Sequence, residues 1–322
     1  MGNLKRKVDI VLATYNGCKY IREQIDSILA MNQFDELVHK IIICDDNSKD
    51  NTLEIIREAV PSEKLLILEN CHGAPFGPAK NFERGIAISK ADYIMLSDQD
   101  DYWEKEKLQA YYREAMILDN NLPFIIFSDL EVVDTNLKTL APSFLKYQSI
   151  GKNWLEHLNN LLIQNIAPGC TMMFNQELIK KSMPFPENCL MHDWWMMLVC
   201  KLYGNIKFIE GKTFIKYRQH DNNQVGAKKN DIISLFSNLS LSLNTAAKNY
   251  IRTVQQMSDF KKRYCDDIPN ENKDFIDALT LIFNTATSRT MRVFKAYKVK
   301  MRKSSAIKTF GTYLIIFKGF NK

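Results

Sequence analysis

Short apolar runs alternate with amphipathic stretches along the first 130 residues of the chain. The amphipathic stretches space their apolar side chains for one helical face, as Ile21, Ile25, Ile28 and Leu29 do. Runs such as IIIC and IIF are continuous, which is typical of parallel strands buried on both faces. The alternation predicts βαβ units and an α/β fold with a mostly parallel sheet flanked by helices. We expect its strands at 8–14, 40–45, 65–69, 92–97 and 123–128.

The pattern changes in the second part of the chain. A helix is expected at 154–164, a loop at 167–170, a strongly amphipathic helix at about 192–203 and a strand at 206–218. From about residue 231 onward the spacing favours helices to the end. The sequence therefore predicts a sheet domain followed by a C-terminal helical appendage.

Composition places the 322 residues among ordinary folded proteins, with 46% hydrophobic and 25% charged residues. No apolar run approaches the ~20 residues that a membrane-spanning helix needs. The opening residues pass directly into strand-like sequence without the cleavage site of a signal peptide. We expect a cytoplasmic protein.

The charges are unevenly distributed along the chain. The last acidic residue is Asp277, and ten basic residues follow it, so the tail carries +10 while the body, with 33 basic and 37 acidic residues, carries −4. Because these bases alternate with apolar residues, the tail resembles an interfacial helix that binds the inner face of an anionic membrane. The alternatives are a helical cap on the catalytic domain or a contact between copies in a homo-oligomer. No nucleic-acid-binding module accompanies the basic residues, so nucleic acid is not an expected partner.

Two common kinds of site are absent from the sequence. Neither G-x-G-x-x-G nor G-x-x-x-x-G-K-[ST] occurs, which excludes the usual loops of dinucleotide-binding dehydrogenases and P-loop ATPases. The seven cysteines include no C-x-x-C pair, which argues against a zinc ribbon or a disulfide framework.

Acidic clusters stand just after two predicted strands. Asp45 and Asp46 follow IIIC, and Asp98-Gln99-Asp100-Asp101 follows YIMLS. Ligands bind at this edge of open α/β sheets, and carboxylates gathered there repel one another unless a cation compensates. Either cluster alone is explained by helix capping. Their equivalent placement favours a site for a divalent ion and a phosphate-bearing ligand.

Further motifs occur in a fixed order. TYN follows the first strand, DDNS the second and D-x-D the fourth, with APGCT at 167–171, HDWW at 192–195 and YRQHDNNQVG at 217–226. Over about residues 7–225 the chain resembles the family 2 inverting glycosyltransferases, and its later motifs are similar to the rhamnosyltransferase-like branch of polysaccharide biosynthesis. The resemblance implies a GT-A nucleotide-diphospho-sugar transferase fold over 1–228, with a helical C-terminal region over 229–322.

The resemblance also implies roles for particular residues. Asp100 and His220 would bind Mn²⁺ or Mg²⁺, and Arg218 would contact phosphate. The nucleotide of the donor would lie against a larger set, namely Thr14, Tyr15, Asn16, Asp45, Asp46, Lys80, Asn81 and Asp98.

Asp193 is the predicted catalytic base. It opens a helix beside an aromatic wall, where partial desolvation would raise its pKa and make it a better base. Asp101 or Glu187 are the substitutes for this role, and helix capping by Asp193 is the structural alternative. The residues expected near the sugar or acceptor are Trp194, Trp195, Gly169 and Cys170, although at least one tryptophan is expected in the core.

We therefore expect a metal-dependent transferase that moves a sugar from a UDP- or dTDP-sugar to a hydroxyl group of a glycan or lipid-linked acceptor, with inversion, in surface polysaccharide biosynthesis. A sugar-nucleotide pyrophosphorylase and a non-catalytic subunit of an assembly complex are the alternatives. TYNGCKY lacks the Gly- and Arg-rich loop of a pyrophosphorylase, and the intact Asp46, Asp98, Asp100 and Asp193 argue against a non-catalytic subunit.

Overall fold

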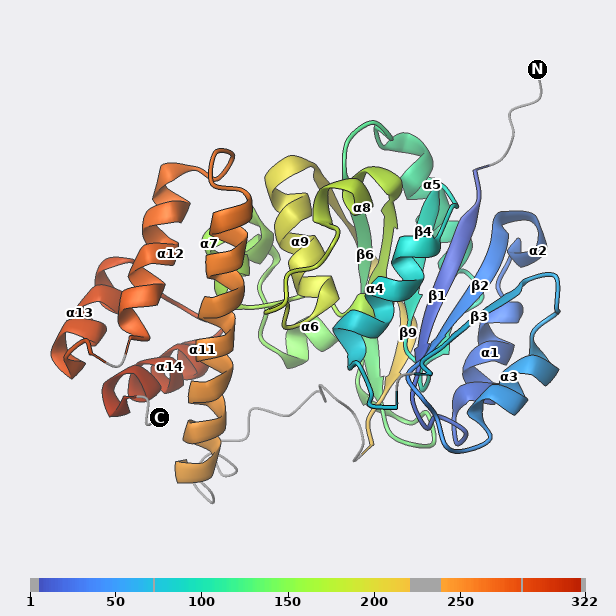
Figure 1. Ribbon diagram of the computed structural model, residues 1–322, viewed down its shortest axis with the longest axis horizontal. Coiled ribbons are helices and arrows are strands. Elements are labelled where there is room, and N and C mark those ends of the chain that lie inside the picture. The colour runs from blue at the N-terminus through green and yellow to red at the C-terminus, as the bar shows by residue number, and fades with distance from the viewer. Residues whose placement is uncertain (1–5, 72, 221–238, 285, 320–322) are drawn as a thin grey trace. The chain divides into compact units, whose positions relative to one another are not determined.

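The structure, a computed structural model, describes residues 6–71, 73–220, 239–284 and 286–319 (Figure 1). The chain divides into two compact units. The first comprises Met1–Phe144, Ala167–Phe185 and Met191–Ala227, and the second comprises Leu145–Ile166, Pro186–Leu190 and Lys228–Lys322. The predicted domain boundary at 228 lies outside the described residues, as do the motif residues 221–226.

Four parallel strands begin the first unit. Their order in the sheet is β3-β2-β1-β4, with Thr14 opposite Asp45 and Leu12 opposite Ser97. Because the strands are parallel and in this register, their carboxyl ends lie at one edge of the sheet, as expected from the sequence. These strands are β1 (Val8–Thr14), β2 (Val38–Asp45), β3 (Leu65–Glu69) and β4 (Tyr93–Ser97).

Helices cover both faces of these strands. In Figure 1, α4 lies in front of β1 and β2, whereas α1 and α3 lie behind the sheet. Helix α4 approaches closely because Gly85 has no side chain, since a Cβ atom there would lie 2.4 Å from Cys44 Sγ. The helices of this half are α1 (Ile21–Leu29), the short α2 (Phe34–Leu37), α3 (Thr52–Ala59) and α4 (Pro78–Ile88).

The sheet continues as a mixed sheet beyond β4. Strand β8 is antiparallel to both β4 and β6, whereas β9 runs parallel to β6 and antiparallel to β5. The parallel prediction therefore holds for the first four strands but not for the whole sheet. The remaining elements are β5 (Tyr102–Trp103), α5 (Lys107–Ile117), β6 (Phe124–Val133), β7 (Thr139–Ala141), β8 (Met172–Asn175), α8 (Gln176–Ser182), α9 (His192–Tyr203) and β9 (Asn205–Arg218).

The second unit is helical. The helix expected at 154–164 is divided in two, because His157 has extended backbone angles (φ −113°, ψ 127°). No helix of the described residues is long and apolar enough to cross a membrane. The elements are α6 (Phe144–Tyr147), which begins at the last residue of the first unit, a 3₁₀ helix (Lys152–Glu156), α7 (Leu158–Ile163), α11 (Leu239–Arg263), α12 (Asn270–Ile282), α13 (Arg289–Lys298) and α14 (Ala306–Lys318).

Candidate active site

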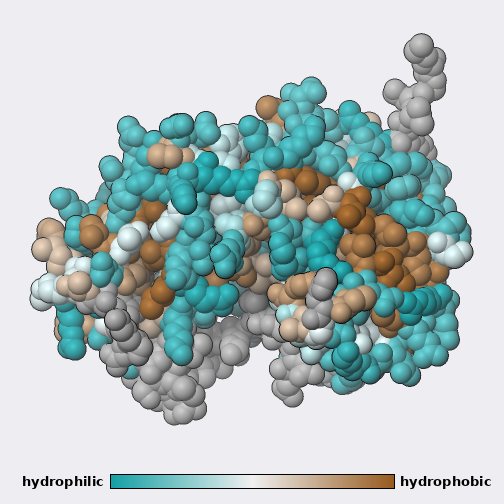
Figure 2. Space-filling view, viewed as in Figure 1, coloured by the Kyte–Doolittle hydropathy of each residue, from teal (hydrophilic) through white to brown (hydrophobic). Residues whose placement is uncertain are grey.

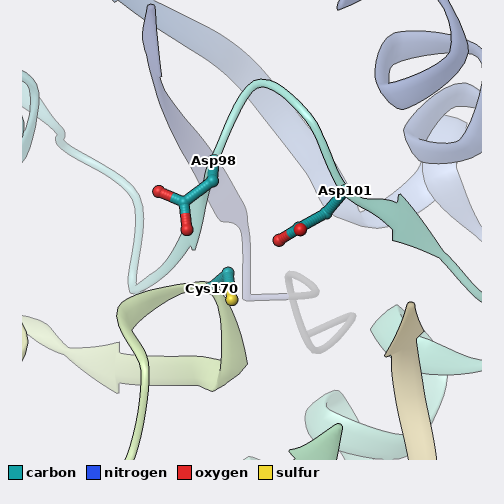
Figure 3. Close-up of side chains that lie close together, drawn as sticks. All are labelled: Asp98, Asp101 and Cys170. Carbon is teal, nitrogen blue, oxygen red and sulfur yellow. The ribbon is translucent and has the colours of Figure 1, made fainter. Parts of the chain in front are cut away.

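The loop after β4 brings carboxylates together. Asp98, Asp101 and Cys170 lie close together, with the Asp101 carboxylate directed toward the other two, as Figure 3 shows; Cys170 lies in a 3₁₀ turn (Gly169–Thr171). One ligand atom of each of these three residues lies within 4.8 Å of the others. The cluster stands at the carboxyl edge of the parallel strands, where the sequence predicts the site.

Burial and neighbouring carboxylates raise the pKa of two residues of this loop, Asp98 and Asp101. Burial, together with the charges of Asp100 and Asp193, raises the pKa of Asp98 to about 7. Burial and the charges of Asp100 and Asp98 hold the pKa of Asp101 well above its usual range. The Asp101 Oδ1 atom accepts a hydrogen bond from Arg218 N, while the buried Oδ2 has no partner among the described residues.

The carboxylates of this loop, although not the thiol of Cys170, fit a hard divalent cation. Such ions take carboxylate oxygens as ligands, and a cation here would relieve the mutual repulsion and the unpartnered buried oxygen. Mn²⁺ or Mg²⁺ therefore suits the residues present.

Lys107 is a buried cation that the sequence analysis did not single out. Its Nζ donates to the carbonyl oxygen of Cys170 at 2.7 Å and lies 3.0 Å from the centroid of the Trp103 ring. Burial lowers its pKa well below the usual range, against the opposing charges of Asp101 and Asp98. Lys107 thus compensates only part of the negative charge beside it. It stands in the run EKEK, which is typical of a solvated helix start, so the sequence carries no signal for this position.

Arg218, at the end of β9, supports the acidic loop. Its Nε donates to the carbonyl oxygen of Asp100 at 2.9 Å, and its guanidinium pairs with Glu23 and lies 4.5 Å from the centroid of the Tyr20 ring. Another donor bonds Thr135 O, and the side chain is buried. Arg218 therefore positions the loop through protein contacts, and its contact to phosphate stays a prediction.

His220 and Asp100, the two predicted metal ligands, lie together. His220 Nε2 is 2.8 Å from Asp100 Oδ2, and its ring stacks on Tyr20 with centroids 5.2 Å apart. A separation of this size is compatible with two ligands of one ion. His220 is also the last described residue before the gap at 221–238.

Asp193, the predicted base, is buried at the start of α9. Its Oδ2 accepts a hydrogen bond from Gly169 N at 2.9 Å, and its Oδ1 accepts one from Trp194 N at 2.6 Å. The N-cap position of α9 is Met191, so Asp193 lies inside the first turn and does not cap the helix in the usual way. Its charge contributes to the raised pKa of Asp98, which places it in the same electrostatic environment.

The two tryptophans after Asp193 are both buried. Trp195 is fully buried, and its indole Nε1 donates to the carbonyl oxygen of Ser182 at 3.0 Å. Trp195 is therefore the core residue of the pair, while Trp194 retains 9% of its surface. Of the two substitute bases, Asp101 lies in the acidic cluster, and Glu187 is exposed in the second unit.

Asp45 and Asp46 contact groups other than the acidic cluster. Asp45 accepts hydrogen bonds from Thr14 Oγ1 at 2.8 Å and from Ser48. Asp46 accepts from Asn70 and from the backbone N–H groups of 76 and 77 at 2.8 and 2.9 Å. Both carboxylates therefore organise the loops that follow β2 and β3, and their contacts to a nucleotide stay predictions.

The turn after β1 joins the two acidic loops. Tyr15 exchanges two hydrogen bonds with the Gln99 side chain, with N···O distances of 2.8 and 3.1 Å, while Asn16 Oδ1 accepts from Lys49 N at 2.8 Å. Tyr15 is exposed at this edge, as a residue that contacts a ligand should be.

On α4, the predicted nucleotide contacts point in different directions. Asn81 is buried, and its Nδ2 donates to the carbonyl oxygen of Cys44 at 2.5 Å, which fixes the helix to β2. Lys80 pairs with Glu83 at 2.5 Å on the exposed side.

Comparison with known proteins finds relatives that are sugar transferases or glycosyltransferases by name. The dTDP-rhamnosyl transferase RfbG of Shigella flexneri is 31% identical over 227 residues, which cover 67% of this chain and 74% of the relative. The UDP-Glc:alpha-D-GlcNAc-diphosphoundecaprenol beta-1,3-glucosyltransferase WfgD of Escherichia coli is 28% identical over 218 residues, which cover 66% of this chain and 76% of the relative.

Solved structures share the fold. The mannosyltransferase PcManGT from Pyrobaculum calidifontis, in complex with GDP-Man and Mn²⁺, matches with a TM-score of 0.56 at 13% identity, covering 98% of this chain and 86% of that one. The predicted GT-A fold is thereby confirmed. The family described as "Glycosyl transferase family 2" matches residues 9–182, which is more than half of the chain. Together with the acidic loop after β4, these matches show that the chain belongs to glycosyl transferase family 2.

Proposed function

We propose that this glycosyltransferase moves a sugar from a nucleoside-diphosphate donor to an acceptor hydroxyl group, with inversion and with the help of a divalent ion. The observation that supports this proposal best is the group of Asp98, Asp100 and Asp101, whose negative charge Lys107 only partly compensates and which shares its electrostatic environment with Asp193. Asp193, a carboxylate near this group, would serve as the proton acceptor of the reaction.

Asp100 and His220 would hold Mn²⁺ or Mg²⁺, and Asp98 lies beside them. The ion would neutralise the diphosphate as it leaves the donor. Asp193 would take the proton of the acceptor hydroxyl as that oxygen attacks the anomeric carbon. Hydrogen bonds from two backbone N–H groups fix this carboxylate, so it needs no reorientation. A single base without a nucleophile beside it is the requirement of an inverting transfer.

The relatives suggest the substrates. Their names specify dTDP-rhamnose and UDP-glucose transfer, and one names a diphospholipid-linked acceptor. We therefore infer a UDP- or dTDP-sugar donor and a glycan or lipid-linked acceptor in surface polysaccharide biosynthesis. Such an acceptor suits attachment of the basic C-terminal tail to the inner face of a membrane.

The test is release of nucleoside diphosphate. The full-length protein is incubated with Mn²⁺ and a panel of UDP-, dTDP- and GDP-sugars, with water or an added glycan as acceptor. We expect release from one donor, its loss in Asp100→Ala, and no change in Asp266→Ala, which removes an exposed carboxylate of the second unit. A silent panel together with no nucleotide-induced shift in Tm would refute the proposal.

A further inference from the structure

The second unit contains an open cavity that the proposed reaction does not use. Its volume is about 730 Å³, within the range of roughly 300–1,000 Å³ that small-molecule sites occupy. One wall is formed by Trp154 and Asn160, and the other by residues 302–306 and the following turns of α14. Arg302 and Lys303 line it, and among the described residues no acidic side chain does.

Within the described ranges, no acidic side chain forms an ion pair with the basic residues beside this cavity. Arg302 is exposed and forms no ion pair in the part of the chain that the structure describes. Lys303 Nζ donates to the carbonyl oxygen of Ile163, and Lys308 Nζ donates to Gln148 O at 2.7 Å. Burial and the charge of Lys308 lower the pKa of Lys303 to about 7, and burial lowers that of Lys308 to about 8. A bound anion would stabilise the charged form of both lysines.

The start of α14 adds backbone donors to the same wall. The first turn of a helix leaves amide groups without intrahelical acceptors and carries the positive end of the helix dipole. Ser305 Oγ satisfies only the amide of Lys308, at 3.2 Å. The loop before the helix is held in place, since Lys303 N donates to Thr309 Oγ1 at 2.9 Å and Ser304 N to Gln164 Oε1 at 3.1 Å. The anion-binding groups are thus already in position.

Aromatic side chains form the rest of the cavity. Trp154, Phe310 and Tyr313 line it, and Phe310 leaves 65% of its surface exposed. Trp154 is 7% exposed, yet its indole N–H has no acceptor among the described residues. A buried donor without a partner is costly, so a ligand oxygen is the natural acceptor.

We propose that this cavity binds a phosphate or diphosphate group carried on an alkyl chain. The phosphate lies at Arg302, Lys303 and the start of α14, and the apolar part lies against Trp154, Phe310 and Tyr313. Two lining cations, Arg302 and Lys303, with Lys308 beside them and a helix N-terminus, match the two or three negative charges of a terminal phosphate or diphosphate better than the single charge of a phosphodiester. A lipid-linked diphosphate acceptor has this chemistry, and to that extent the assignment rests on the proposed function.

Direct binding tests the proposal without donor or turnover. Octyl phosphate, below its micellar concentration, is titrated calorimetrically into the full-length protein. Inorganic phosphate, octyl glucoside and dihexanoyl phosphatidylglycerol are titrated in parallel. We expect octyl phosphate to bind at least ten times more tightly than each of the other three. If inorganic phosphate binds as tightly as octyl phosphate, the alkyl chain does not contribute to binding. If octyl glucoside binds as tightly, the phosphate group does not contribute. If the phosphatidylglycerol binds as tightly, the cavity binds bulk lipid and the proposal is wrong.

Matched variants locate the site. Arg302→Gln should weaken octyl phosphate binding at least tenfold, whereas Arg289→Gln, an exposed arginine of the same basic segment outside the cavity, should not. Phe310→Ala should weaken octyl phosphate binding severalfold. Phe317, which is also exposed on α14 but lies outside the cavity, is the control, and Phe317→Ala should leave binding unchanged. Equal effects within either pair would place the ligand elsewhere.

Two further readouts separate this site from the catalytic one. The indole N–H resonance of Trp154 should shift when octyl phosphate binds, and a resonance that does not move would contradict the assignment. Asp100→Ala should abolish transfer and leave octyl phosphate binding intact. If Asp100→Ala loses octyl phosphate binding, the cavity assignment is wrong. If no donor sugar releases nucleoside diphosphate but octyl phosphate still binds, only the proposed function is wrong.

Discussion

At the scale of single residues, the candidate active site is defined by opposing charges that do not cancel. Asp98 and Asp101 are held where burial and neighbouring carboxylates oppose ionisation, and the one buried lysine beside them has a lowered pKa. Perturbed pKa values of this kind cluster at functional sites. The arrangement leads to separate expectations for proton transfer and for metal binding.

Replacing Asp193 by Asn should stop transfer without preventing donor binding. The amide keeps the size of the side chain but cannot accept a proton, so kcat should fall by about 10²–10⁴. Donor affinity, measured by calorimetry with Mn²⁺, should change by less than about threefold. Glu187→Gln is the control, since Glu187 is exposed in the second unit. If Glu187→Gln stops transfer and Asp193→Asn does not, the base has been misassigned.

Stabilisation by Mn²⁺ should depend on pH. The pKa of Asp98 is raised in the folded protein, so its favourable contribution to stability is present below the unfolded pKa of about 4 and is lost as pH rises through about 7. A metal ion held by Asp100 and His220 beside Asp98 would favour its ionised form and so reverse this loss. The increase in Tm on adding Mn²⁺ should therefore be larger at pH 8 than at pH 6. In Asp98→Asn the Mn²⁺-induced increase in Tm should differ less between pH 6 and pH 8. If the unmodified protein shows the same increase in Tm at both pH values, the assignment of this pKa to Asp98 is wrong.

Sequence reasoning could find some of these residues but not others. Asp98, Asp100 and Asp193 stand at strand or helix ends within recognisable motifs, and His220 follows a predicted strand. Lys107, Tyr20 and Glu23 lie in ordinary helical surroundings, and their roles depend on contacts across 63 to 200 residues of sequence, such as Lys107 Nζ with Cys170 O. Separations of this kind leave no local pattern.

At the scale of elements, the loop after β4 is fixed by three different segments. Arg218 at the end of β9 holds the carbonyl group of Asp100, and the turn after β1 holds Gln99. Gly17 makes that second contact possible, because a Cβ atom there would lie 2.3 Å from Gln99 Oε1. The third segment is the turn at 169–171, which links Cys170 to the loop and Gly169 to Asp193.

Gly169→Ala should impair the base more than the fold. A Cβ atom at this position would lie 2.7 Å from His192 Nε2, so the turn or α9 must move, and Asp193 moves with it. We expect kcat to fall at least tenfold, with donor affinity nearly unchanged. Gly311→Ala is the matched control, because a Cβ atom there meets nothing within 4 Å and alanine favours the helix. Equal activity of the two variants would show that the turn tolerates the shift.

The elements themselves were predicted to different degrees. Strand β1 is buried on both faces and has a continuous apolar run. It has the expected bounds, as do the partly exposed edge strand β3 and helix α9. Strands β5 and β7 have two and three residues, which is too short for any periodicity. They exist because β9 and β6 provide partners for them.

At the scale of the whole molecule, charge and exposed apolar surface both concentrate at the C-terminus. Figure 2 shows apolar surface interleaved with hydrophilic side chains over the C-terminal helices, and a larger apolar patch over β2 and β3. On α13 and α14, Phe294 and Tyr297 are 59% and 76% exposed, and Phe317 is 54% exposed. No acidic residue follows Asp277 in the sequence. We expect a surface with these properties to bind anionic interfaces.

Binding to anionic vesicles should therefore depend on α13. The double variant Arg289→Glu with Lys298→Glu should bind vesicles of phosphatidylcholine and phosphatidylglycerol at least about 30-fold more weakly, since each basic residue near the surface contributes about 1 kcal/mol. The control is Lys90→Glu with Lys212→Glu, two exposed lysines of the first unit. Co-sedimentation at 50 and 500 mM salt measures both. Equal loss in the two double variants would indicate a general charge effect.

The contact between Lys107 and Trp103 also makes the site observable. The Lys107 amino group lies against the Trp103 ring, and the two carboxylates whose charges act on it, Asp98 and Asp101, lie in the same loop as the proposed metal ligand Asp100. Loading the site removes negative charge from one side of Lys107 and so alters the field at the indole. We therefore expect metal binding to change the fluorescence of Trp103. In Trp103→Phe this change should disappear, while the emission of the other three tryptophans remains.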